Sequence, residues 1–241
     1  MSHTKREWLE LLGIMEYDIP EILILEGTWW DKNAYESRLA YLDEVKEVKF
    51  PNMFLGKFGD RKVMFSCAYG APRAVEPIHI FGTLGTPIVV QIGSCGSLQQ
   101  QVKTGDIVVP NQAKIGEGAS QYYQSFETSY PDNSLASQAV THIEQHHVKA
   151  HEGPHLTTSA LFQQNSSTIE SWTKAGFLSV DMETSAVFSA ARYFGMRAVS
   201  LIFVWDELLR GRTWLDSFSR EEIEKHNTAN RVTYETALTL I

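Results

Sequence analysis

Apolar and polar positions alternate in blocks along this chain, and the blocks predict strands and helices in turn. Short apolar runs that end at glycine, proline or polar residues predict strands at residues 22–25, 53–58, 62–68, 87–92, 107–109, 156–161, 177–180 and 198–205. Apolar positions spaced three and four apart predict helices at residues 5–12, 31–42, 75–84, 135–147, 166–175 and 183–194, and from residue 220 onward.

This order of elements predicts an α/β fold with crossover connections. The second and third strands meet at Gly59-Asp60, which is typical of a β-hairpin. The hairpin and the extra strands near the middle predict a mixed central sheet, partly closed into a barrel and flanked by helices. Since no repeat or linker interrupts the pattern, residues 1–241 are predicted to form a single domain.

Composition narrows the classes of partner. Hydrophobic residues make up 43% of the chain, which is enough for a sizeable core. The formal net charge of −8 argues against a nucleic-acid partner, although local arginines can still hold a small anion. The polar N-terminus and the absence of a long apolar run predict a protein that does not span a membrane and is cytoplasmic.

Two blocks place carboxylates where α/β enzymes carry their chemistry. Asp181, Met182 and Glu183 stand at the start of a predicted helix, and Asp206 ends the apolar strand that follows it. A strand that delivers an acid at its carboxyl end is typical of an α/β active site. The structural alternatives are capping of the helix for the first pair of acids and a surface carboxylate for Asp206.

A third block, at residues 89–98, is an apolar strand that runs into Gly93-Ser94-Cys95-Gly96. If these glycines form a turn, its backbone N–H groups and the Ser94 hydroxyl could hold an oxyanion. A tight turn without a ligand is the commoner explanation of such a short motif. Cys95 is interpreted as a buried, reduced thiol, because no base stands at a recognisable spacing from it.

Together, these three blocks resemble the signature of the nucleoside phosphorylase family that includes hexameric purine nucleoside phosphorylase and uridine phosphorylase. The resemblance implies the phosphorylase/hydrolase-like fold. It also implies cleavage of the N-glycosidic bond of a nucleoside, with a purine as the expected base, by phosphate to give free base and ribose 1-phosphate. Inorganic phosphate is then a co-substrate, and neither a metal ion nor an organic cofactor is expected.

The resemblance assigns the nucleoside to the acidic block. The two oxygens of Glu183 would accept hydrogen bonds from the vicinal hydroxyls of ribose, and Met182 would pack against the sugar. Asp181 occupies the position where purine-specific relatives carry a carboxylate near the base. Phe162 matches a position that stacks on the base, with ordinary core packing as an equally weighted alternative.

Asp206 would protonate N7 of the purine as the glycosidic bond breaks. In the family, this aspartate usually follows a serine, but here Trp205 takes that position. An arginine usually holds the acid, and Arg220 is the best candidate, followed by Arg210 and Arg212.

Phosphate would bind at Ser94 and at Gly27. Arg61, in the predicted hairpin, matches an arginine that relatives send into a neighbouring subunit. This match predicts a homo-oligomer, either a dimer or a trimer of dimers, with shared sites. Arginine is absent from two expected positions, where Gln91 and Asp31 stand instead. Arg73, at a predicted helix start, is expected to restore part of the positive charge.

Two other functions stay open. A nucleosidase of the same superfamily would use water in place of phosphate, with Asp31 as the base, although Asp31 also suits a helix N-cap. A non-catalytic nucleoside-binding protein is the third possibility, motivated by the missing arginines. His142 and His146 stand one helical turn apart, but without further ligands a solvated helix face is expected, so no metal site is predicted.

Overall fold

A computed structural model describes residues 3–213 and 215–240 of the chain. The strands are β1 (Ile22–Gly27), β2 (Asp43–Glu47), β3 (Met53–Phe58), β4 (Arg61–Cys67), β5 (Ile88–Ser97), β6 (Ile107–Gly116), β7 (Thr128–Ser129), β8 (Ala150–Thr158), β9 (Ser179–Asp181) and β10 (Arg197–Glu207). The helices are α1 (Lys5–Leu12), α2 (Asp31–Leu39), α3 (Ala71–Leu84), α4 (Asn133–Gln145), α5 (Ser166–Lys174), α6 (Thr184–Tyr193) and α7 (Arg220–Thr239). No described helix is both long enough and apolar enough to cross a membrane.

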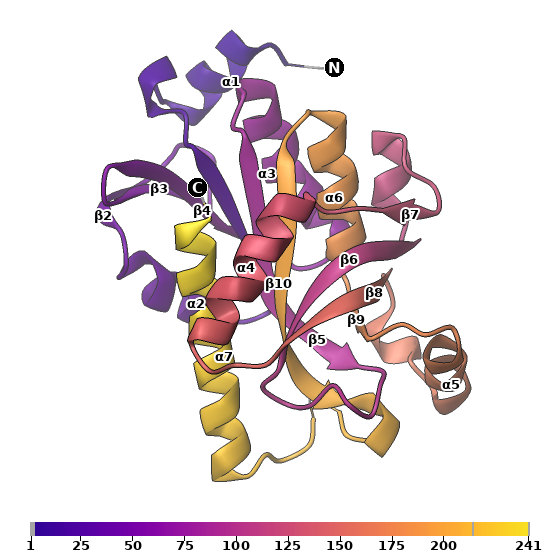
Figure 1. The fold of residues 1–241 in the computed structure, drawn as a ribbon. Helices are drawn as coiled ribbons and strands as arrows, with labels where there is room; N and C mark the ends of the chain where they lie inside the picture. The colour runs from indigo at the N-terminus through magenta and orange to yellow at the C-terminus, as the bar shows by residue number, and fades with distance from the viewer. Residues whose placement is uncertain (1–2, 214, 241) are drawn as a thin grey trace.

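The strands form one ten-stranded mixed sheet in the order β10-β6-β8-β9-β5-β1-β4-β3-β2, with β7 paired to β6. An additional pairing joins β10 to β5, so that β10, β6, β8, β9 and β5 close into a ring. The predicted α/β fold, with a mixed sheet that is partly barrel-like, is therefore confirmed. Figure 1 shows β10 near the centre of the molecule, and β5 lies beside it as its parallel neighbour.

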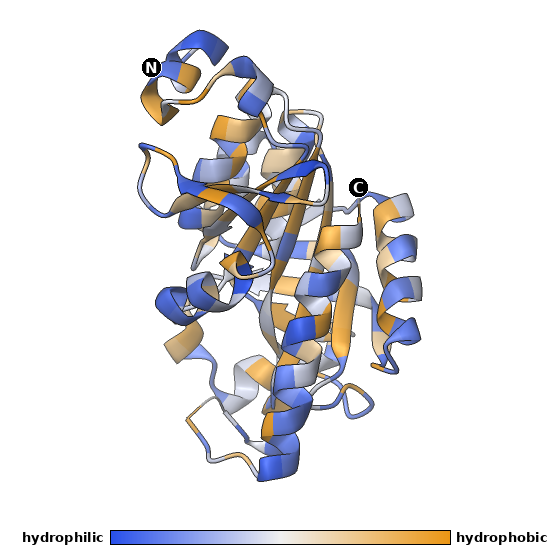
Figure 2. Ribbon diagram, turned by 90° about the vertical axis from the view of Figure 1, so that its left-hand side faces the viewer, coloured by the Kyte–Doolittle hydropathy of each residue, from blue (hydrophilic) through white to orange (hydrophobic). Residues whose placement is uncertain are grey.

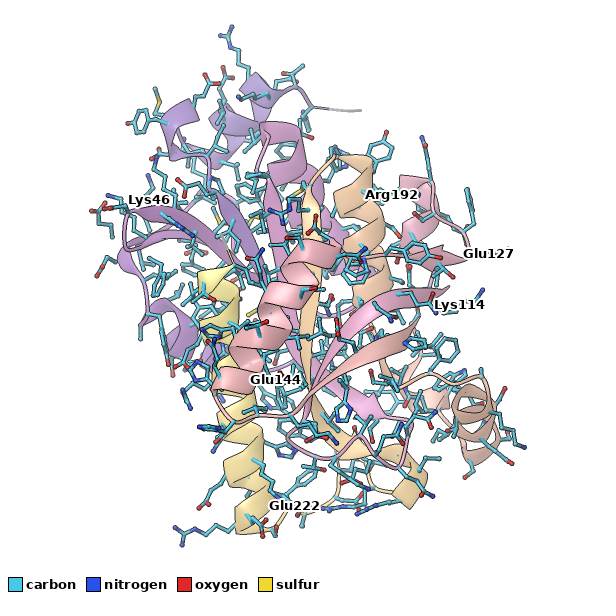
Figure 3. The ribbon with its side chains drawn as sticks, in the orientation of Figure 1. Lys46, Lys114, Glu127, Glu144, Arg192 and Glu222 are labelled. Carbon is cyan, nitrogen blue, oxygen red and sulfur yellow. The ribbon has the colours of Figure 1, made fainter. Side chains whose placement is uncertain are left out.

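Helices cover both faces of the sheet because its strands are apolar on both sides. In β1, Ile22 and Ile24 belong to the core beneath α2, α4 and α7, whereas Leu23 and Leu25 belong to the core beneath α1, α3 and α6. Figure 2 shows the apolar strands at the centre and helices with one apolar and one polar face outside them. Charged side chains such as Lys46, Glu144 and Arg192 lie at the periphery (Figure 3).

The structure corrects the sequence predictions at the glycine block and at the acidic block. Strand β5 does not break into a turn at Gly93, because β1 pairs with it as far as Gly93 and β10 pairs with it beyond that point. Asp181 ends β9 instead of opening a helix, and Glu183 is the N-cap residue of α6. Strand β2 was not predicted.

The parallel strands β4, β1, β5 and β10 lie side by side and run in one direction. Their carboxyl ends therefore meet at one edge of the sheet, where α/β proteins place their ligands. The segments after β1 and β4, the far part of β5 and the end of β10 are all found at this edge.

Candidate active site

A cavity of about 120 Å³ opens at this edge of the sheet. Six of the residues singled out from the sequence line it: Gly27, Ser94, Asp181, Met182, Glu183 and Asp206. They come from β1, β5, β9, β10 and the start of α6, so the fold brings the three sequence blocks to one place.

Although Glu183 is the N-cap residue of α6, its side chain makes no capping hydrogen bond to the helix and points toward the ends of β1 and β4. Its Oε1 atom accepts the backbone N–H of Gly70 at 2.6 Å, and its residue exposure is 5%. Burial raises the pKa of Glu183 to about 8, and the negative charge of Asp181 adds to the shift. The alternative that the Glu183 side chain serves only to cap the helix is therefore wrong. Its carboxyl group faces the cavity, where it can accept hydrogen bonds from hydroxyl groups.

Gly27 lies directly against this carboxylate. A β-carbon at Gly27 would come within 2.8 Å of Oε2 of Glu183, so a side chain here would displace the acid. Gly118 offers a matched control, because a β-carbon there would meet nothing within 4 Å.

We expect Gly27→Ala to raise the KM for nucleoside by about 10–100-fold, the cost of one lost hydrogen bond whose partner stays buried and unsatisfied. The physical reason is displacement of the Glu183 carboxylate by the added methyl group. Steady-state kinetics of Gly27→Ala, with Gly118→Ala in parallel, checks this expectation. A KM equal to that of the unmodified protein would show that Glu183 does not bind the sugar.

A β-bulge in β10 places Asp206. Val204 lies opposite Cys95 and Asp206 lies opposite Gly96, so Trp205 is the extra residue. Asp206 is 7% exposed, and a β-carbon at Gly96 would come within 3.2 Å of its Oδ1 atom. The missing side chain at Gly96 therefore leaves room for the carboxyl group beside the cavity.

Asp181 has a different environment from Glu183. Its Oδ2 atom accepts both the backbone N–H of Thr184, at 3.0 Å, and the Thr184 hydroxyl, at 2.6 Å. These bonds cap the start of α6, as the structural alternative for this acid supposed. Although Asp181 lines the cavity, its oxygens are bonded to the protein.

A second hollow of about 230 Å³ adjoins the first. The two hollows share five lining residues, namely Gly27, Thr28, Trp30, Ser94 and Trp205. Amides of Asn33, Asn227 and Asn230 line the second hollow, together with Glu26. Arg38 binds Glu26 through two N–H groups at 2.8 and 3.0 Å, so this buried acid is already paired.

No lysine or arginine is among the described residues that line either hollow. Arg73 pairs with Glu76 on the surface of α3. Arg61 begins β4 at the exposed end of the hairpin. Arg220 is the first residue of α7, and its side chain is 94% exposed and pairs with Glu224.

The prediction that Arg220 holds Asp206 is therefore not supported. Arg220 forms an ion pair with Glu224, one helical turn further along α7, and its side chain lies in solvent. The other two candidates, Arg210 and Arg212, pair with Glu207 and Glu222.

Asp31 also lies outside the lining of both hollows. It is exposed at the first position of α2, where its carboxylate accepts the backbone N–H of Lys32 at 2.7 Å. The N-cap position belongs to Trp30, so the helix-cap interpretation of Asp31 is off by one residue.

Aromatic rings surround the mouth of the cavity. The Trp29 ring lies 5.0 Å from Tyr69 and 6.1 Å from Phe162, whose exposure is 74%. Phe162 thus stands beside the cavity and is not a core residue, while its stacking on a base stays a prediction. Tyr69 was missed from the sequence, although its place directly after a predicted strand was a usable signal.

Within the described part of the chain, no group of three or more His, Cys, Asp or Glu side chains is arranged to hold a metal ion. His142 instead contacts α7, with its Nδ1 atom 2.9 Å from the Thr236 hydroxyl.

Comparison with known proteins identifies the family to which this chain belongs. Residues 32–239 match the family model of the phosphorylase superfamily, and the chain belongs to this superfamily. It is 30% identical over 206 residues to a guanosine phosphorylase of Halorubrum lacusprofundi, covering 83% of this chain and 84% of the relative. It is 26% identical over 223 residues to a DeoD-type purine nucleoside phosphorylase of Caldanaerobacter subterraneus, covering 89% and 93%. A crystal structure of uridine phosphorylase from Vibrio fischeri superimposes with a TM-score of 0.81 at 20% identity, covering 95% of this chain and 94% of that one.

Proposed function

We propose that the protein cleaves the N-glycosidic bond of a purine nucleoside with inorganic phosphate, giving free base and ribose 1-phosphate. The observation that carries the proposal is that Glu183 and Asp206, two buried acids, line one cavity. Membership of the phosphorylase superfamily supports the reaction type. The purine assignment is supported by the relatives that are guanosine and purine nucleoside phosphorylases.

In the proposed reaction, Glu183 accepts hydrogen bonds from the two ribose hydroxyls, and Met182 packs against the sugar. Asp206 gives a proton to N7 of the base as the bond between C1′ and the base nitrogen breaks. A phosphate oxygen attacks C1′ from the side of Ser94 and Gly27, where the second hollow opens. The developing positive charge on the sugar is stabilised by the negative charge of the attacking phosphate. The reaction needs no metal ion or organic cofactor.

Phosphate carries a charge that neither hollow balances with a lining lysine or arginine of the described chain. We propose that Arg61 of a second copy and Arg73 supply it, which requires a homo-oligomer, a dimer or a trimer of dimers. Asp31 is not given a role in this reaction. We further propose that residues 1–241 act as one domain and that the protein works in the cytoplasm.

Hydrolysis by water is the second candidate function. It is favoured by one observation: the second hollow is lined by neutral amides, and its buried acid is already paired with Arg38. Water needs no cationic site, whereas phosphate does.

The assay that decides between these functions uses inosine, guanosine, adenosine and uridine, each with and without phosphate. We expect phosphate-dependent release of purine together with ribose 1-phosphate. A phosphate-independent rate that yields free ribose would establish the hydrolase instead. Binding without turnover under any condition, with Asp206→Asn unaltered in nucleoside affinity, would support the non-catalytic alternative.

A further inference from the structure

Asp181 is a buried acid that the proposed reaction does not use. Its side chain is 1% exposed, yet its pKa lies below the ordinary value. Burial by itself would raise this pKa, but the charge of His155 and hydrogen bonds from His155, Thr184 and Gln91 outweigh it. Such a carboxylate persists in a protein interior only when its oxygens are well bonded.

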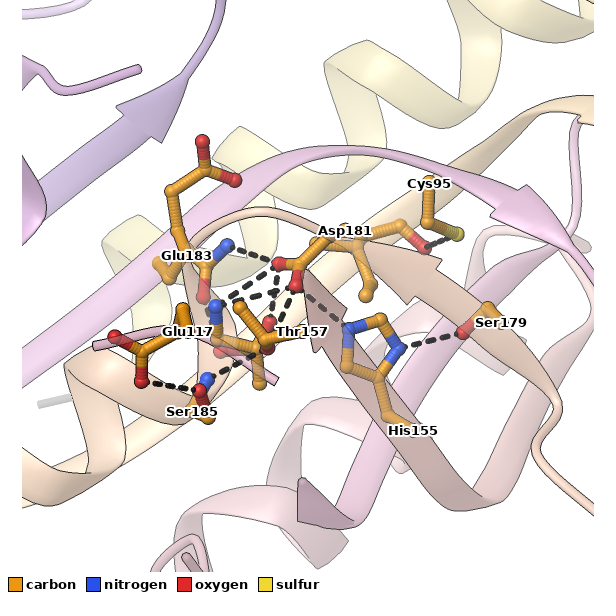
Figure 4. Close-up of polar contacts among 12 residues, drawn as sticks. Cys95, Glu117, His155, Thr157, Ser179, Asp181, Glu183 and Ser185 are labelled. Atoms are coloured by element: carbon orange, nitrogen blue, oxygen red, sulfur yellow. Dashed lines mark hydrogen bonds and ion pairs between the residues drawn. The ribbon is translucent and has the colours of Figure 1, made fainter. Parts of the chain in front are cut away.

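The bonds to Asp181 come from segments far apart in the sequence. His155 Nε2 and the Thr157 hydroxyl, both in β8, lie 2.8 Å from Oδ1. The Gln91 amide, in β5, donates to Oδ2 at 2.9 Å. Thr184, in α6, donates to Asp181 as well. Asp181 thus forms hydrogen bonds with residues of β5, β8 and α6 (Figure 4).

Each partner is itself held in place. His155 Nδ1 lies 2.8 Å from the Ser179 hydroxyl, and the Ser200 hydroxyl donates to Oε1 of Gln91 at 2.6 Å. Gln91 is 1% exposed and lines neither hollow. Its amide is therefore committed to Asp181 and does not face the cavity, where the resemblance had led us to expect an arginine for phosphate.

The cluster controls the backbone that carries Glu183. Thr184 donates its N–H to Asp181, and Ser185 donates its N–H to the Thr157 hydroxyl at 2.9 Å. Glu183 precedes these two amides, and Figure 4 shows its carboxylate pointing away from the cluster. The two backbone amides that directly follow Glu183 are therefore both bonded to this cluster, and the Glu183 carboxylate itself is bonded to Gly70.

We propose that His155 is a positioning residue of the ribose site, which together with Gln91 and Thr157 holds Asp181 so that the start of α6 fixes the Glu183 carboxylate. The inference rests on the proposed function, because it needs Glu183 to bind the ribose hydroxyls. The inference adds His155 to the site as a residue that does not contact the substrate. It also gives Gln91, in the middle of β5, a role as a hydrogen-bond donor to Asp181.

The test compares His155→Leu, which removes the donor, with His155→Gln, whose amide can still donate to Asp181. His151→Leu is the matched control. His151 lies on the same strand and contacts a different acid, with its Nε2 atom 2.8 Å from Oδ2 of Asp106. Thr157→Val removes a second bond to Asp181 with little change of shape, and it replaces His155→Leu if that variant does not fold. Because it also removes the bond that the Thr157 hydroxyl accepts from the Ser185 N–H, only the exchange of the Thr184 amide is then compared.

The first readout is kcat/KM for a purine ribonucleoside and for its 2′-deoxy analogue. We expect His155→Leu to lower the ribonucleoside value by about 10–100-fold, mainly through KM, since the buried Glu183 side chain no longer lies where it can accept the ribose hydroxyls. The deoxy analogue lacks one of the two hydroxyls that would bond to Glu183. Its kcat/KM is therefore expected to fall less, and the ratio of kcat/KM for the ribonucleoside to that for the deoxy analogue is expected to decline. We expect His155→Gln to recover most of this ratio and His151→Leu to keep it. Equal losses on both substrates, or no recovery in His155→Gln, would overturn the inference.

The second readout does not need turnover. Hydrogen exchange at the Thr184 and Ser185 amides is expected to accelerate in His155→Leu and to stay unchanged in His151→Leu. Unchanged exchange in His155→Leu would overturn the positioning role whatever the activity. Faster exchange in a protein that cleaves no nucleoside would instead refute the proposed function and leave the structural link between His155 and α6 standing.

Discussion

Replacement of Asp206 by asparagine is expected to lower kcat for purine nucleosides by about 10²–10⁴-fold, the usual contribution of a positioned general acid. Asparagine keeps the shape of the side chain in the space left by Gly96 but cannot supply the proton that N7 needs. The KM for nucleoside is expected to stay within a few fold, since the sugar is bound by other residues. Steady-state kinetics with inosine and guanosine measures both constants.

A substrate that needs no proton provides the control. An N7-methylated purine nucleoside already carries a positive charge on its base and departs without protonation. Asp206→Asn should therefore cleave this substrate at close to the unmodified rate while remaining slow on inosine. An equal loss on both substrates would mean that Asp206 acts on the shape of the site and does not protonate the base.

Glu183→Gln is expected to lower activity and to raise stability. The pKa of Glu183 is raised to about 8 by burial and by Asp181, so the folded protein retains a proton that the unfolded chain releases. The stabilisation from this residue is complete below 4.5, the ordinary pKa of a glutamate in the unfolded chain, and is lost as pH rises through about 8. Glutamine carries no ionisable group, but its amide also loses water on burial. We therefore expect the free energy of unfolding of Glu183→Gln to exceed that of the unmodified protein by about 1–3 kcal/mol near pH 8.

Urea unfolding of both proteins at pH 5, 7 and 8.5 tests the stability effect, and the same samples are assayed for activity. We expect the difference in unfolding free energy to grow across this series while kcat/KM falls by about 100-fold or more, because the NH2 group of the glutamine amide cannot accept a hydrogen bond from a ribose hydroxyl. Glu170→Gln is the control: Glu170 is a surface residue paired with Lys174, so its replacement should leave the free energy of unfolding close to that of the unmodified protein at every pH. A difference that does not depend on pH would contradict the raised pKa of the buried Glu183.

Local signals in the sequence predicted much of the fold. Helix α1 ends at Gly13, whose φ of 67° favours glycine, and the Gly59-Asp60 turn joins β3 to β4 as expected. Strand β2 was missed because all five of its residues are exposed, so it has no apolar alternation. The course of β5 through Gly93 was also missed, since it depends on pairing with β1 and β10, which lie far away in the sequence.

At the cavity, too, local signals in the sequence predicted some residues, whereas contacts between distant segments could not be predicted. The acids Glu183 and Asp206 follow from the resemblance and from strand ends, and the structure places both on one cavity. The environment of Asp181 could not be read from the sequence, because its partners come from β5, β8 and α6. Arg220 was proposed because in the family an arginine usually holds the acid, but the direction of a side chain at the start of a helix is fixed only by folding.

A crystal structure with a purine nucleoside and phosphate bound tests the central claim most directly. The account predicts that both ribose hydroxyls lie within hydrogen-bonding distance of the Glu183 carboxylate, that N7 of the base faces Asp206, and that phosphate lies on the side of Ser94. A nucleoside bound elsewhere, or one whose sugar contacts neither acid, would contradict it.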